Sequence, residues 1–154
     1  YSFQLRNLLK GIGQQMKWSV RDESLHSKMG CKLFRDMCKE NNQLLHLCRE
    51  DIVNAAETMV KLESSYIDKM FEAGDIEGIS ANNLKQFIKK RANEKLVELG
   101  YIDLGSYFAY DKKAASNLDW FYHLTGGITH TDFFAIRPTD YSKANEGEDF
   151  EDIW

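Results

Sequence analysis

The strongest constraint on the fold is a helical repeat of apolar residues that runs through most of the chain with little to interrupt it. Apolar side chains return every three or four residues from Ile12 to about Lys39, and again from about Gln43 to Ala73. The 154 residues contain one proline, Pro138, and are 43% hydrophobic and 29% charged. These features predict an all-α protein with a core large enough for one domain.

Glycines and small polar residues predict where the helices begin and end. Two further helices are expected, over residues 83–99 and 114–124, the second of them short and rich in aromatic residues. The predicted boundaries are a turn at Glu40–Asn42, a stop at Gly74, an N-cap at Ser80 or Asn82, and a second stop at Gly100, while Gly11 and Gly13 indicate either a break or a close approach of another helix.

The chain divides by composition into a helical part, residues 1–127, and an extended part, residues 128–154. The last thirteen residues hold five acids and lack a helical period, so they cannot bury enough surface to fold alone. Their large apolar groups are Phe150, Ile153 and Trp154. Such a tail either keeps the protein in solution or docks into a partner's groove, and apolar groups at the terminus favour docking.

Charge, hydropathy and cysteine content exclude several classes of function. A net charge of -4 gives no reason to expect nucleic-acid binding, and no apolar run approaches the ~20 residues needed to cross a bilayer. The three cysteines, Cys31, Cys38 and Cys48, are odd in number and lack the spacing of a metal site. We therefore expect reduced thiols in a cytoplasmic protein.

The stretch with the clearest chemistry is a Glu-x-x-His motif formed by Glu23 and His26 on the first long helix. Residues three apart share a helix face, and this face should point into a core because it also carries apolar and small residues. A buried carboxylate is costly unless it is paired or binds a metal, and Glu-x-x-His is the ligand pattern of ferritin-like di-metal proteins. The motif also occurs by chance. The apolar and small residues on the same helix face as Glu23 and His26, called the predicted stripe, are Ile12, Met16, Ser19, Gly30, Phe34 and Met37.

One Glu-x-x-His is only a part of such a centre, which takes about four carboxylates and two imidazoles from four helices. The remaining histidines, His46, His123 and His130, lack a carboxylate at the right offset or lie in the irregular last third. Asp22 either orients a histidine ligand of a neighbouring helix or is an exposed acid. The other ligands should therefore come from outside this chain.

The sequence around Glu23 and His26, and several segments after it, resemble one known protein family. The string Gly11–His26 resembles the second Glu-x-x-His helix of the small, radical-generating subunit of class I ribonucleotide reductase. The similarity extends over essentially the whole chain and is far more specific than the motif alone. The downstream segments that match are residues 71–78, 84–88, 96–101, 125–134 and 137–142.

The resemblance implies a ferritin-like helical bundle and a di-iron or di-manganese centre, which generates the radical that the large subunit uses to make deoxyribonucleotides. It implies that Glu23 and His26 are metal ligands and that Asp22 links a metal-bound histidine to the radical path. Tyr141 would pass the oxidising equivalent between subunits, although by itself it reads as a surface tyrosine. The final residues, Phe150–Trp154, would dock on the large subunit.

The chain also departs from that family. The upstream half would supply an Asp ligand, the first Glu-x-x-His, a further Glu and usually the radical tyrosine, and none has a counterpart here. We therefore expect the C-terminal portion of a small subunit divided into two polypeptides, completed by a separate N-terminal chain and assembled as a dimer of small subunits. The alternatives are a metal-free docking or regulatory module that acts through its acidic tail, and another ferritin-like di-iron oxidase.

Overall fold

The computed structural model describes residues 9–76 and 78–121, and these residues form helices without a β-strand. The predicted all-α class is therefore confirmed. An isolated antiparallel bridge joins Ile76 and Ile79. None of the helices in this part of the chain is long and apolar enough to span a membrane. The elements are α2 (Lys10–Glu40), α3 (Leu44–Leu47), α4 (Arg49–Met70), α5 (Ala81–Leu99), the 3-10 helix η1 (Ile102–Leu104) and α6 (Lys112–Ser116).

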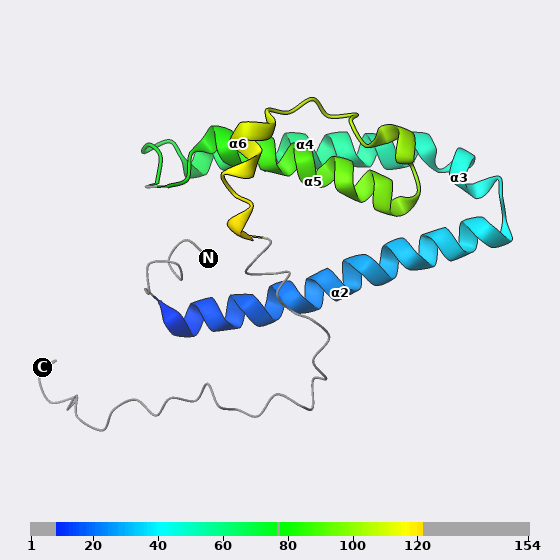
Figure 1. Cartoon of the computed structure of the whole chain (residues 1–154), viewed down its shortest axis with the longest axis horizontal. Coiled ribbons are helices and arrows are strands. Elements are labelled where there is room, and N and C mark those ends of the chain that lie inside the picture. Colours follow the sequence, from blue (N-terminus) through cyan, green and yellow to red (C-terminus); the bar gives the residue numbers. More distant parts are fainter. Residues whose placement is uncertain (1–8, 77, 122–154) are drawn as a thin grey trace, which may run out of the picture.

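Two of the long helices form a hairpin, and the third projects away from it. Helices α4 and α5 pack side by side, with η1 and α6 against α5 (Figure 1). Helix α2 meets α3 and α5 at its C-terminal end and diverges from the hairpin toward its N-terminal end (Figure 1). The short helix α3 is the elbow between α2 and α4, so it sets the direction in which α2 projects.

The boundaries of α5 follow the predicted capping residues closely. Of the two N-cap candidates, Ser80 is the cap, because its Oγ accepts a hydrogen bond from the Asn83 N–H at 3.1 Å. At the other end Gly100 takes a φ of 112°, and the Tyr101 N–H donates to the Leu96 carbonyl at 3.0 Å. This is the hydrogen bonding of a glycine C-cap, which leads the chain directly into the core.

Two predictions about the long helices are wrong. The break at Gly11 and Gly13 is absent, because both residues lie inside α2, where a glycine costs only about 1 kcal/mol relative to alanine. The predicted helix from Gln43 to Ala73 is divided at Cys48, whose ψ of -5° departs from helical values. The Cys48 N–H donates to the Leu44 carbonyl and the Cys48 carbonyl accepts from the Ile52 N–H, both at 3.0 Å, so α3 ends and α4 begins at this residue.

The last described helix begins earlier than expected. Asp111 caps it by accepting hydrogen bonds from the Lys113 and Ala114 N–H groups at 2.8 and 3.2 Å. Helix α6 therefore starts at Lys112 rather than Ala114, and it ends at Ser116, so Trp120 and Phe121 of the predicted helix lie outside it. It packs on α5 through Ala115, which is fully buried, and this contact closes the end of the hairpin away from α3.

The core lies at the elbow, where α2, α3, α4, α5 and η1 converge. Its buried centre is Leu96, Tyr101 and Leu104, and Phe34 and Leu45 pack against it from α2 and α3. The Phe34 and Tyr101 ring centroids are 6.3 Å apart. This cluster holds the C-terminal end of α2 to the rest of the protein, together with a hydrogen bond of 2.9 Å from the Arg35 guanidinium to the Glu98 carbonyl.

Candidate metal centre

Glu23 and His26 lie on the same side of α2, as their spacing predicts. Glu23 Oε2 and His26 Nδ1 are 3.6 Å apart, which is too far for a hydrogen bond, so neither side chain is fixed by the other. Their side chains are 74% and 72% exposed. The expectation that this pair is buried in a core is therefore wrong for the fold that this chain forms by itself.

The apolar residues that share this face are exposed as well. Ile12, Met16 and Met37 are 57%, 52% and 47% exposed, and only Phe34 of the predicted stripe packs into the core. The reason is the way α2 is held: it meets the hairpin near the elbow, so the rest of its length is not pressed against α4 and α5 (Figure 1). A long apolar helix face with a carboxylate and an imidazole in it is thus open.

The donor set on this face fits a share of a metal centre. Glu23 offers carboxylate oxygens and His26 offers an imidazole nitrogen, the two donor types used by di-metal carboxylate proteins. Within residues 9–76 and 78–121, no group of three or more His, Cys, Asp or Glu side chains is placed to hold a metal ion. The pair can therefore contribute to a centre, but further donors are needed to complete one.

The other acids and the histidine of this region do not join the pair. Asp22 is exposed beside Glu23, so both of its predicted roles stay open. His46 is exposed on α3, beyond the C-terminal end of α2. Asp36 binds the Lys32 and Lys39 ammonium groups at 2.5 and 2.8 Å. These two hydrogen bonds, of which the one from Lys32 has the larger effect, lower the pKa of Asp36 to about 2. Its carboxylate is thus engaged by two cations that would compete with a metal ion.

Several predicted site residues fall outside the part of the chain that the structure describes. These are the relay candidate Tyr141, the docking candidates Phe150, Ile153 and Trp154, and the histidines His123 and His130. The predicted boundary between residues 127 and 128 also lies there. The three cysteines are described: they are free thiols, and Cys31 is buried.

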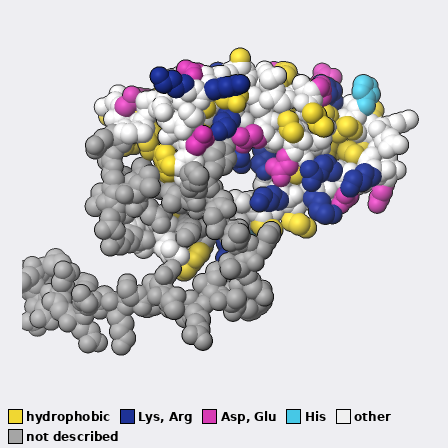
Figure 2. All heavy atoms as spheres, in the orientation of Figure 1, with side chains coloured by type: hydrophobic (Ala, Val, Ile, Leu, Met, Phe, Trp, Pro, Cys, Tyr) yellow, Lys and Arg dark blue, Asp and Glu magenta, His cyan; other side chains and the backbone are white. Residues whose placement is uncertain are grey.

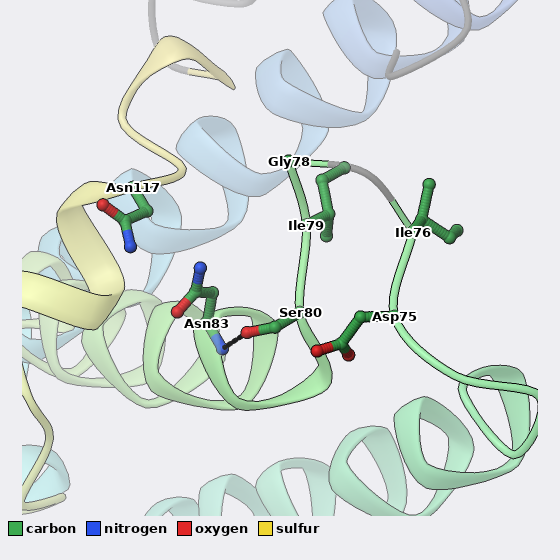
Figure 3. Close-up of a pocket in the computed structure, with 7 residues that line it drawn as sticks. All are labelled: Asp75, Ile76, Gly78, Ile79, Ser80, Asn83 and Asn117. Atoms are coloured by element: carbon green, nitrogen blue, oxygen red, sulfur yellow. Dashed lines mark hydrogen bonds between the residues drawn. The ribbon is translucent and has the colours of Figure 1, made fainter.

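A polar pocket of about 610 Å³ lies between the start of α5 and α6 (Figure 3). Two of its polar side chains form hydrogen bonds at the start of α5: Asp75 Oδ1 accepts from the Ala81 N–H at 3.0 Å, and Ser80 caps the helix. Asn83 and Asn117 face the pocket from α5 and from the end of α6 (Figure 3). The arrangement explains how α5 begins and does not gather a set of metal donors.

A second apolar strip on α2 was missed by the sequence reasoning. Leu25, Met29 and Leu33 follow one another at intervals of four residues and are 54%, 58% and 63% exposed, and Trp18 is 58% exposed. The four-residue interval was a usable signal, because such residues share a helix side. Apolar side chains (yellow) also reach the surface between Lys and Arg (dark blue) elsewhere on the molecule (Figure 2). An exposed helix face with this many apolar side chains is typical of a surface that packs against another polypeptide segment.

Sequence comparison identifies similar proteins. The family described as "Ribonucleotide reductase, small chain" matches residues 1–105. The probable ribonucleoside-diphosphate reductase small subunit 048L of Invertebrate iridescent virus 3 is 30% identical over 146 residues, which are 94% of this chain and 37% of that protein. The corresponding subunit 376L of Invertebrate iridescent virus 6 is 28% identical over an alignment 174 residues long, which covers 99% of this chain and 48% of that protein.

A bacterial relative shows the same partial coverage. The ribonucleoside-diphosphate reductase subunit beta of Chlamydia pneumoniae is 26% identical over 144 residues, 93% of this chain and 39% of that protein. The chain therefore spans less than half the length of each of these three relatives. No solved structure matches it significantly.

Proposed function

This chain belongs to the ribonucleotide reductase small-chain family, and from that premise we propose that it supplies part of the di-metal centre of a ribonucleoside-diphosphate reductase small subunit. The family implies a ferritin-like bundle, with which the all-helical structure agrees. The observation that carries the proposal is the placement of Glu23 and His26, an oxygen and a nitrogen donor on one open side of a long helix.

The roles of the two side chains follow from their chemistry. Glu23 would hold the metal through a carboxylate oxygen and His26 through a neutral imidazole nitrogen, because a ligand must present a free lone pair. When bound, the di-iron or di-manganese centre would supply, with oxygen, the one-electron oxidation that generates the stored radical.

The remaining ligands would come from residues outside this chain. Three observations support this: Glu23 and His26 are exposed, no group of three donors among the described residues is placed to hold a metal ion, and the chain spans under half of its relatives' length. We propose that the N-terminal portion of the small subunit, as a separate polypeptide, completes the bundle. Two such small subunits would form a dimer.

The family resemblance supports a path that carries the oxidising equivalent from the metal centre to the large subunit. Asp22 would accept a hydrogen bond from a metal-bound histidine of the completing polypeptide, which would orient that ring. Tyr141 would relay the oxidising equivalent, since a tyrosine can lose an electron and a proton together. Phe150, Ile153 and Trp154 would dock the tail on the large subunit that reduces ribonucleotides to deoxyribonucleotides.

The test is metal content and radical signal in the reconstituted small subunit. The chain is co-expressed with the N-terminal portion, and the complex is examined by elemental analysis and electron paramagnetic resonance. Glu23→Gln and His26→Ala should each reduce bound metal and abolish the radical signal, whereas Glu50→Gln, at an exposed acid of α4, should change neither. Unchanged metal content in both ligand variants would remove the basis of the proposal.

The exposure of Glu23 and His26 also favours one alternative, a metal-free docking module that acts through the acidic tail. The two functions separate in the same variants. A docking module with Glu23→Gln would bind the large subunit as before and would contain no metal before or after the change. Loss of metal on the same substitution supports the di-metal function.

A further inference from the structure

An apolar groove runs between α4 and α5 on the hairpin. Its volume is about 430 Å³, and its walls are almost entirely hydrocarbon. Ala55, Ala56 and Met59 line it from α4 and Ala92 from α5, and both Ala55 and Met59 are exposed. Apolar surface of this kind is costly to leave in water, so the groove is a candidate docking surface.

The shape of the groove suits an α-helix. On α4 the lining residues fall between 52 and 63, and on α5 between 88 and 99, with steps of three and four residues on both walls. Each wall covers eleven residue steps, which correspond to about 16 Å, or three helical turns, at ~1.5 Å per residue. The three alanines have short side chains, so the ridge of another helix can approach the two backbones closely. A helix is also an occupant whose own backbone polar groups are satisfied inside an apolar groove.

The charges at the groove select the side on which an occupant carries its acids. Glu63 lies on the α4 wall, whereas Arg91 and Lys95 lie on the α5 wall. Arg91 and Lys95 each pair with an acid three residues on, Glu94 and Glu98, at 2.7 and 2.5 Å, but those acids do not line the groove. An amphipathic helix with acids toward α5 and a base toward Glu63 would complement both walls.

The groove is continuous with the contact that holds α2. Its end near the elbow is formed by Ile52, Ala56 and Leu99, which pack on the same buried cluster as Phe34 of α2. A helix seated in the groove would therefore extend an interface that the chain has already begun.

We propose that this groove seats one amphipathic helix of the small-subunit portion that this chain does not contain, and that it is the surface through which the two portions hold together. The inference rests on the proposed function and names the seat of its partner. The occupant is argued from length as well as charge, because the chain covers only 37% to 48% of its two viral relatives. A second copy is a poorer occupant, since two facing grooves leave both hollow.

The experiment measures binding between this chain and the part of the Invertebrate iridescent virus 3 small subunit that lies outside its 146-residue match. Ala55→Trp fills the groove and Ala55→Glu places a charge in it. The matched control is Ala109→Trp, at an exposed alanine of the connector before α6. Because Ala55 is exposed, all three variants should keep the helix content and melting temperature of the unsubstituted chain.

The unsubstituted chain and Ala109→Trp should bind the viral portion alike, and both Ala55 variants should bind it about a hundredfold more weakly, as expected when a central interface site is blocked. Absence of binding by the unsubstituted chain, or equal binding by the Ala55 variants, would overturn the inference. So would a homodimer of this chain that sedimentation shows to be broken by Ala55→Trp, because a second copy would then be the occupant.

The same set separates this inference from the proposed function. In metal-free buffer Glu23→Gln should bind the viral portion with the affinity of the unsubstituted chain, whereas the complex supplied with metal should bind less of it than the unsubstituted complex. Retained metal in that variant would refute the metal role and leave the groove standing. Unchanged binding by the Ala55 variants, with metal lost in Glu23→Gln, would refute the groove and leave the metal role standing.

Discussion

The Tyr101 hydroxyl donates a hydrogen bond to the Leu45 carbonyl at 2.8 Å, joining residues 56 positions apart in the chain. The Tyr101 ring is 2% exposed, and burial raises the pKa of its phenol, so the hydroxyl stays a donor over the range in which the protein is handled. Arg49 lies with its guanidinium carbon 5.6 Å from the ring centre and is paired with Asp103. This cluster fixes the elbow, and the elbow sets the direction of the helix that carries Glu23 and His26.

Removing the Tyr101 hydroxyl should therefore loosen the elbow. Tyr101→Phe leaves the Leu45 carbonyl without its donor while keeping the ring, and should lower the free energy of unfolding by about 1 kcal/mol. Urea unfolding followed by circular dichroism measures the change. Tyr107→Phe is the control, because the Tyr107 hydroxyl binds Glu57 on an exposed surface and should matter less. Equal effects of the two substitutions would contradict the role given to Tyr101.

Asn93 should be the most sensitive polar side chain of the described core. It is 3% exposed, and its amide forms two hydrogen bonds of 2.9 Å with the backbone N–H and carbonyl of Phe108. Asn93→Leu strands both groups and should destabilise the protein by about 2–3 kcal/mol. The same urea measurement on Gln86→Leu gives a comparison at a half-buried position of α5, where one backbone group, the Asp111 N–H, loses its acceptor and a smaller loss is expected. A loss under 1 kcal/mol at Asn93 would show that the connector is held by other contacts.

Two glycines should respond in opposite directions to alanine. Gly100 has a φ of 112°, which a side chain disfavours, so Gly100→Ala should cost about 1–2 kcal/mol. Gly30 lies within α2, and an added Cβ there meets nothing within 4 Å, so Gly30→Ala should stabilise the helix by up to about 1 kcal/mol. Thermal unfolding of the two variants checks both signs, and a shift in the same direction would contradict the boundary assigned to α5.

The charge cluster on α2 predicts a defined pH dependence. Lys32 and Lys39 lower the pKa of Asp36 from 3.8 to about 2, so the ionised carboxylate is favoured in the folded state. Its stabilising contribution is present above pH 3.8 and is lost as the pH falls through about 2. A carboxyl-carbon NMR titration should place the Asp36 midpoint near 2, and the double substitution Lys32→Ala and Lys39→Ala should return it toward its ordinary value. An unshifted midpoint in the unsubstituted chain would contradict the pairing.

The sequence was a good guide to local structure and a poorer guide to burial. Ser80, Gly100 and the apolar period of residues 12–39 led to the right helices, because capping and helix periodicity are local properties. The same period suggested that Glu23 was buried, and it is exposed. Periodicity shows which side of a helix is apolar, but whether that side is covered depends on segments that pack from elsewhere.

Part of the site lay within reach of sequence reasoning and part did not. The pairing of Glu23 with His26 follows from their three-residue spacing alone. The groove between α4 and α5 did not follow, because a groove depends on how two helices pack across a loop. The division of the helical path at Cys48 also has no strong local signal, such as a proline or glycine, in the sequence.

The central claim is that this chain carries a share of a di-metal centre and cannot hold the centre by itself. Isothermal titration of the purified chain with Mn²⁺ tests it most directly, beside the same titration of the chain complexed with the N-terminal portion. We expect two tight metal sites per complex and none in the chain alone. Glu23→Gln and His26→Ala should weaken the sites in the complex. Two tight, stoichiometric sites in the isolated chain would contradict it.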